Sequence, residues 1–138
     1  MSNWTHVAGI IRVDYLKIPG VTRDIDFEEE IGRELTFDDI WYETVVYEEY
    51  ESHPQSFLPS GSEGSLKMSV WANPDDSHLS AYTVSIFGDL KDHDDENEII
   101  EWFKAQCNKF LVRQAVITVY NEYHDEPKTW TFEGREDK

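Results

Sequence analysis

The segment Asp95–Tyr123, DENEIIEWFKAQCNKFLVRQAVITVYNEY, contains the change of periodicity that decides the fold. Asp95 and Glu98 form a capping box, and the apolar residues that follow recur at helical spacing, which predicts a helix over about Glu96–Phe110. From Arg113 onward, apolar and polar residues alternate, and this predicts a strand over Arg113–Tyr123. The chain therefore passes directly from an amphipathic helix into a half-buried strand.

Further strands are predicted on both sides of this segment. Thr5–Tyr15 alternates well, and so do Leu66–Ala72 and Leu79–Gly88, which flank the strong turn Asn73–His78 and should form a hairpin. Thr129–Phe132 is long enough for a short last strand. Four alternating segments and one short addition indicate a sheet with at least one half-buried face.

The region between the first strand and the hairpin is rich in acids. Phe37–Tyr50 has apolar residues at helical spacing and predicts a second helix, although Val45–Tyr47 is β-prone and a strand there is the rival interpretation. Asp24–Leu35 could form a shorter helical turn. Ser52–Ser65 is predicted to be a loop from its serine, glycine and proline content, and loops of this length are usually functional or mobile.

The resulting order of elements is β-α-β-β-α-β with a short extra strand at the end. This order resembles the ferredoxin-like, or split βαβ, arrangement over roughly Thr5–Tyr123. The resemblance implies an α+β sandwich in which two helices cover one face of an antiparallel sheet and the other face stays open. We expect one domain over residues 1–133 and a frayed tail over residues 134–138.

Strand parity sorts the side chains into a covered face and an open face. The covered face is expected to carry Val7, Ile11, Val13, Met68, Val70, Val84, Ile86, Ile117 and Val119. The open face is expected to carry Arg12, Lys67, Ser69, Trp71, Thr83, Ser85, Phe87, Thr118 and Tyr120. The predicted core includes Ile11, Val84, Ile99, Phe103, Cys107 and Ile117.

Composition excludes several classes of protein. The chain of 138 residues has 29 acids and 12 bases, a net charge of −17, which argues against direct binding of nucleic acid and of anionic membranes. Nineteen aromatic residues argue against intrinsic disorder. The single cysteine, Cys107, excludes an internal disulfide, and there is no signal peptide or long apolar run. These features favour a reduced, cytoplasmic protein.

No motif for catalysis or metal binding is present. An EF-hand loop starting at Asp92 would need Gly and Glu where Asn97 and Phe103 stand, so the acids of Asp89–Glu98 are expected to be a solvated turn. The histidines occur singly, and four of the five lie in or beside predicted loops, where solvation is expected. Nucleophile-elbow, Walker A and dinucleotide motifs are missing. We therefore predict a protein without catalytic residues, cofactor or metal.

The acids are concentrated in two blocks. Asp24–Glu51 holds twelve acids and one base, a net charge of −11, and Asp89–Glu98 adds −5. Such segregation opposes the compact state through self-repulsion, so it favours an anionic surface that engages a basic protein, either as a mimic of nucleic-acid phosphates or as a docking site. An ordinary solvated face is the alternative. The residues predicted to contact the partner are Asp38, Asp39, Glu43, Glu48, Glu49 and Glu51.

The open face of the sheet is the competing candidate site. Arg12, Lys67, Trp71 and Tyr120 are expected there, and an exposed aromatic residue on such a face can anchor a partner. The face would then hold a second copy of the chain, as a homodimer, or a small ligand.

Three stretches resemble small uncharacterised proteins of bacterial phages and prophages. They are Ser69–Trp71, Ala81–Leu90 and Arg113–Ile117, and the resemblance covers about Gly64–Tyr123. It implies an accessory protein of a mobile element, such as an inhibitor of host defence or an assembly factor. It brings no active-site motif with it.

Overall fold

A computed structural model describes residues 3–16, 18, 20–34, 57–73, 79–93 and 95–132. The described part is of the α+β class, with a five-stranded antiparallel sheet and two helices. Its elements in chain order are β1 (Trp4–Leu16), α1 (Phe27–Glu30), β2 (Lys67–Ala72), β3 (Leu79–Lys91), α4 (Glu96–Cys107), β4 (Val112–Asn121) and β5 (Lys128–Thr131).

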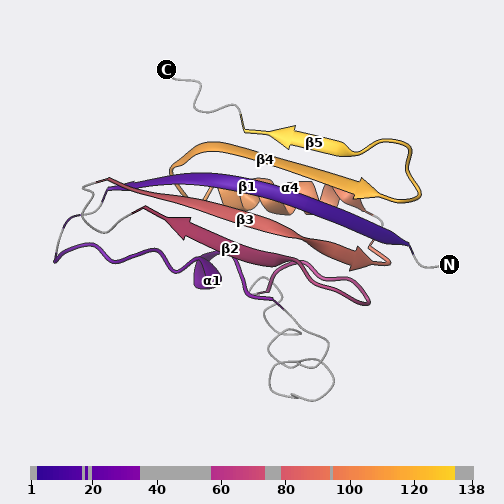
Figure 1. Cartoon of the computed structure of the whole chain (residues 1–138), viewed down its shortest axis with the longest axis horizontal. Helices are drawn as coiled ribbons and strands as arrows, with labels where there is room; N and C mark the ends of the chain where they lie inside the picture. The colour runs from indigo at the N-terminus through magenta and orange to yellow at the C-terminus, as the bar shows by residue number, and fades with distance from the viewer. Residues whose placement is uncertain are drawn as a thin grey trace, which may run out of the picture.

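The strands lie in the order β2-β3-β1-β4-β5, and every neighbouring pair is antiparallel. β1 is central and pairs with β3 over its whole length, from Trp4 opposite Lys91 to Leu16 opposite Leu79. In Figure 1, α4 lies behind the sheet, across β1 and β4, whereas α1 lies beside β2. The sheet therefore has one face covered by α4 and one face with no described element in front of it.

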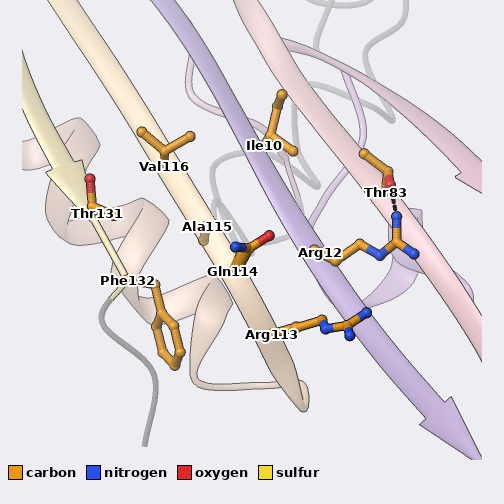
Figure 2. Close-up of a pocket in the computed structure, with 9 residues that line it drawn as sticks. All are labelled: Ile10, Arg12, Thr83, Arg113, Gln114, Ala115, Val116, Thr131 and Phe132. Carbon is orange, nitrogen blue, oxygen red and sulfur yellow. Dashed lines mark hydrogen bonds between the residues drawn. The ribbon is translucent and has the colours of Figure 1, made fainter.

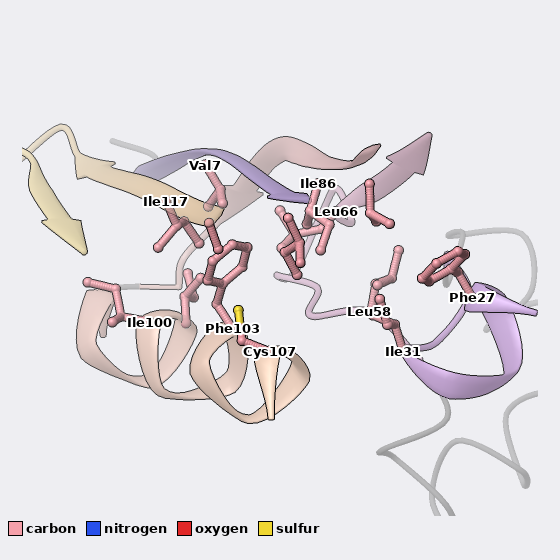
Figure 3. Packing of buried hydrophobic residues seen from close by; sticks show 14 of the residues in the cluster. Val7, Phe27, Ile31, Leu58, Leu66, Ile86, Ile100, Phe103, Cys107 and Ile117 are labelled. Carbon is pink, nitrogen blue, oxygen red and sulfur yellow. The ribbon is translucent and has the colours of Figure 1, made fainter. Parts of the chain in front are cut away.

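The capping box predicted for α4 is confirmed. The side chain of Asp95 accepts a hydrogen bond from the backbone N–H of Glu98 at 3.2 Å, which satisfies one of the free donors at the helix start. The apolar stripe of the helix faces the sheet, and Figure 3 shows Phe103 between the helix and Ile117. The helix ends at Cys107, three residues before the predicted end.

The predicted core is confirmed. Phe103, Ile11, Val84 and Ile117 have no exposed surface. The remaining predicted members, Ile99 and Cys107, are also buried. A second part of the core lies under β2 and β3, where Phe27, Ile31, Leu58 and Leu66 are buried together (Figure 3).

The predicted faces of the strands follow the observed register. Val70 has the covered-face parity but is 42% exposed, because it lies on the edge strand β2. The hairpin of β2 and β3 and the short last strand are confirmed. The prediction of Asp89–Lys91 as a connection was wrong, since β3 continues through these residues to reach Trp4 of β1.

The long connection between β1 and β2 is described in two parts. The short turn predicted within Asp24–Leu35 is confirmed as α1, whose N-cap Asp26 accepts from the backbone N–H of Glu29. The helix predicted over Phe37–Tyr50 lies outside the described residues. Of the predicted loop, residues 57–65 are described, and Phe57 anchors them in the core. No helix in the described ranges is long and apolar enough to span a membrane.

Candidate binding face of the sheet

The face opposite α4 exposes large apolar side chains from four strands. Ile10, Trp71, Phe87, Val116 and Tyr120 have between 38% and 55% of their surface exposed. Each stands on the strand parity that points away from α4, opposite the buried parity of residues such as Ile11 and Val84. A contiguous surface of this kind is typical of a contact site.

A β-bulge in β4 modifies one end of this open face. Arg12 pairs with Gln114, and the next residue, Val13, pairs with Val112, so Arg113 is an extra residue without a partner on β1. The ladder continues beyond the bulge, because the N–H of Asp14 donates to the carbonyl of Leu111 at 3.0 Å. Bulges re-aim the side chains next to them.

The consequence is visible in the side chains. In a regular strand, neighbours point to opposite faces, yet Arg113 and Gln114 both line the same hollow on the open face. Val112 and Ala115 are both buried although they are three residues apart. A regular strand would bury every second residue, so this spacing shows the same extra residue in β4. The bulge therefore adds an arginine to the open face where regular alternation would turn its side chain toward the core.

Arg12 and Arg113 lie at one hollow of about 680 Å³. Figure 2 shows Arg113 reaching from β4 across β1, on the side where Arg12 extends toward β3. The other described residues that line the hollow are Ile10, Thr83, Gln114, Ala115, Val116, Thr131 and Phe132, and none of these is acidic.

Two contacts hold the guanidinium of Arg12 in place. Its Nη1 donates to Thr83 Oγ1 at 3.2 Å, and its Cζ lies 5.9 Å from the centre of the Trp71 ring. Its Nε is buried and has no hydrogen-bond partner. In the described part of the chain, neither Arg12 nor Arg113 forms an ion pair with a carboxylate. Both arginines thus lack a carboxylate partner among the described residues, although the chain has 29 acids.

An apolar band continues from this hollow along the middle of the face. Ala8, Ile10, Phe87 and Val116 line a second, smaller depression of about 230 Å³, together with parts of their neighbours. Ile10 and Val116 belong to both depressions, and these two residues pair across β1 and β4. The charged end and the apolar band are therefore one continuous surface.

The far end of the face contains a histidine held between two carboxylates. His6 Nδ1 lies 2.6 Å from Asp89 Oδ1, and its Nε2 lies 2.8 Å from Glu122 Oε2. The two hydrogen bonds, first that of Asp89 and then that of Glu122, raise the pKa of His6 above its ordinary value of 6.5. The ring also stacks on Tyr120, with centroids 6.3 Å apart. This network links β3, β1 and β4.

The four residues predicted for the sheet-face site separate into different parts of that face. Arg12 and Trp71 are in contact at the bulge end, as described above. Tyr120 lies at the His6 end, and Lys67 lies on the edge strand β2 opposite Phe87. Nothing in the described ranges covers Trp71 enough to bury it, and it is 55% exposed. Arg113, Gln114 and the His6 network were not predicted.

The acidic site predicted from the sequence lies outside the described residues. This applies to all of Asp38, Asp39, Glu43, Glu48, Glu49 and Glu51. The described beginning of the same block is exposed, with Asp24, Asp26 and the three glutamates of α1 at the surface. The acidic character of this surface is thus established for its first part.

Two residues of the second acidic block depart from the expectation of a solvated turn. Glu96, the first residue of α4, is 2% exposed and is paired with Nδ1 of His124, while its Oε2 has no partner. The side chain of His93 is only 16% exposed, which corrects its prediction as solvated. Among the described residues, no group of three or more His, Cys, Asp and Glu side chains is placed to hold a metal ion.

The open face presents three different kinds of surface along its length. It combines two arginines at one end, an apolar band in the middle and a histidine held between two carboxylates at the other end. The only cysteine, Cys107, is in the core, and burial raises the pKa of its thiol to about 11, which removes it as a nucleophile.

Comparisons with known proteins complete this description. No family model matches the chain, no curated protein matches it, and no solved structure matches it.

Proposed function

We propose that this chain is a non-enzymatic binding protein and that the open face of its sheet is the recognition surface. The occupant is anionic at one end and apolar along its body. One observation carries this proposal: a bulge adds Arg113 to a face that already holds Arg12, and no carboxylate of the described residues pairs with either arginine.

The balance of charge strengthens this observation. The chain has 29 acids and 12 bases, yet among the described residues neither arginine has a carboxylate partner. A dimer that superposes the two arginine ends of the open face would bring like charges together, at a cost in free energy. The proposal therefore favours a ligand or partner of opposite charge over a symmetric homodimer, which is the alternative occupant.

A fragment screen on the ¹⁵N-labelled chain tests this proposal. The expected hits carry a negative charge on an apolar group, and they shift amide resonances of β1, β3 and β4 on the open-face side. Sedimentation of the free chain as a monomer is the accompanying expectation. Hits confined to the separate depression that Arg23 and Lys109 line with Val13–Leu16, or a tight dimer through the open face, would contradict it.

A second candidate function uses the acidic block. Its support is the net charge of −11 in Asp24–Glu51 together with the exposure of the acids around α1. The partner would be a basic protein, and the action would be that of an inhibitor of host defence or of a nucleic-acid mimic, in keeping with the resemblance to phage and prophage proteins. Each exposed contact contributes only about 0.2–1 kcal/mol, so several acids must act together.

The test of this second candidate is an affinity pull-down from bacterial lysate at low and high salt. Changing Glu43, Glu48, Glu49 and Glu51 together to Gln should abolish a salt-sensitive association. The matched control changes Asp125, Glu126, Glu133 and Glu136 to Gln, which removes the same charge elsewhere. Equal losses for both quadruple variants would show an effect of net charge and overturn the assignment to the acidic block.

For the fold, we propose a ferredoxin-like arrangement with additions. Support comes from the position of β3 between β1 and β2, which is the split βαβ relation, and from the position of β4 on the other side of β1. The added strand β5 and the four-residue α1 depart from the six-element motif. An experimental structure of residues 35–56 would test it, since a helix on the α4 side of the sheet is expected there.

A further inference from the structure

We propose that the hollow beside the bulge binds a small amphipathic acid, with its oxyanion head between Arg12 and Arg113 and its apolar body on the band of Ile10 and Val116. This inference rests on the proposed function and deepens it by naming the class of ligand. The head is a carboxylate or a phosphate, because a guanidinium fork matches the two oxygens of either group.

The head-binding end is partly preorganised. The contacts with Thr83 and Trp71 fix the guanidinium of Arg12 before any ligand arrives, so less side-chain entropy is lost on binding. Arg113 and Gln114 are both exposed and add further N–H donors from the bulge. No carboxylate is among the described lining residues, so the charged groups that an anion meets there are both guanidinium groups.

The apolar end sets the size of the ligand. The hollow of about 680 Å³ lies within the range of roughly 300–1,000 Å³ that is usual for small-molecule sites. Phe132 closes the side next to β5, and its backbone N–H donates to the carbonyl of Ala115 at 2.8 Å, which holds this end of the chain against β4. Ile10 and Val116 form the floor, and they lead into the smaller depression at Phe87.

The arrangement selects against two other classes of ligand. A cation would lie between two guanidinium groups without a counter-charge, which is unfavourable. A fully polar anion would leave the exposed surfaces of Ile10 and Val116 in water and would gain nothing from them. An acid with an apolar body satisfies both ends at once.

The experiment compares three probes of similar shape on the ¹⁵N-labelled chain: 4-phenylbutyrate, 3-phenylpropyl phosphate and the neutral 4-phenylbutanamide. We expect the two anions to shift amides of residues 10–12, 83 and 113–116 and the amide probe to bind at least about tenfold more weakly, since charge-assisted hydrogen bonds are lost. The ratio of the two anions identifies the preferred head. Equal binding of the amide probe would overturn the inference.

Variants locate the head. Arg113→Gln should weaken the anions at least about tenfold and leave the amide probe unchanged, because only the charged contact is lost. Arg113→Lys keeps the charge without the planar fork and should be intermediate. Arg23→Gln is the matched control, since Arg23 is an exposed arginine outside the hollow, and it should leave all three probes unchanged.

The failures of the two proposals are distinguishable. If the anions still bind the open face equally well after Arg113→Gln, the head does not bind at Arg113, although the open face is supported as a binding surface. Anions that shift only amides elsewhere in the chain overturn both. Because Arg113 is exposed and lies outside the core, the folded state of each variant can be verified from its unchanged amide spectrum at β2 and α4.

Discussion

The two faces of the sheet come from the same strands but differ in the burial of their side chains and in the partners of their charged groups. On the face under α4, Ile11, Val84 and Ile117 are completely buried and pack around Phe103. On the opposite face, Ile10 and Val116 stay exposed, and the charged residues next to them lack partners of opposite charge in the described part of the chain. One face therefore holds the fold together, and the other is the face that we propose for recognition.

The largest expected effect lies on the covered face. Phe103→Ala removes a fully buried ring and should lower the free energy of unfolding by about 3–5 kcal/mol. The matched variant Phe87→Ala removes the same ring from the open face, where Phe87 is 44% exposed, and should cost less than about 1 kcal/mol. Urea unfolding of both variants measures the contrast. Similar losses would mean that the open face is part of the core.

Adjacent residues on β1 give a second contrast. A Cβ at Gly9 would lie 2.9 Å from Cε1 of Phe103, so Gly9→Ala should destabilise by about 1–3 kcal/mol through overpacking. Ala8 is exposed on the other face, and Ala8→Val should change stability by no more than about 0.5 kcal/mol. Thermal and urea unfolding measure both. If Gly9→Ala is neutral, the packing between β1 and α4 is looser than described.

The smallest effect concerns pH. The pKa of His6 is raised above 6.5, so the stability that its imidazolium gains between Asp89 and Glu122 is fully present below pH 6.5 and is lost as pH rises through the folded-state pKa. The wild type should therefore exceed His6→Gln in free energy of unfolding at pH 5.5, and this difference should disappear by pH 8.5. Since the side chain is 39% exposed, the change should be under about 1 kcal/mol.

Urea unfolding of the wild type and of His6→Gln at pH 5.5 and at pH 8.5 measures this change. Groups that both proteins share contribute equally to the two free energies, so their titration cancels in the difference. A direct titration of the His6 ring by NMR should give a midpoint above 6.5, and it should fall after Asp89→Asn. A constant difference in stability between the two pH values would contradict the role of the carboxylates.

The parts of the fold that depend on local sequence could be predicted. The capping box at Asp95 and the apolar stripe of α4 lie within a few residues of each other, and the alternation of β1 is visible without its partners. The faces of the strands follow from the same alternation. The edge position of Val70 could not be seen from its own strand, because it depends on which neighbours pair.

The candidate site depended on contacts between distant segments. The bulge at Arg113 is visible only in how its neighbours Val112 and Gln114 pair with β1, about a hundred residues earlier. One sign of the bulge is local. Val112 and Ala115 are three residues apart, whereas residues on the same face of a regular strand are separated by an even number of positions. The carboxylates that hold His6 are 83 and 116 residues away, so no motif could have shown them.

The central claim is that the bulge creates a positively charged spot on a protein whose net charge is −17. An anionic paramagnetic chelate tests it directly, because the excess negative charge should keep such a probe away from most of the surface. The account predicts that the chelate broadens the amides of residues 12, 83 and 113–116 more than a neutral chelate does, while broadening most other amides less. Weaker broadening of these amides by the anionic probe than by the neutral one would contradict the claim.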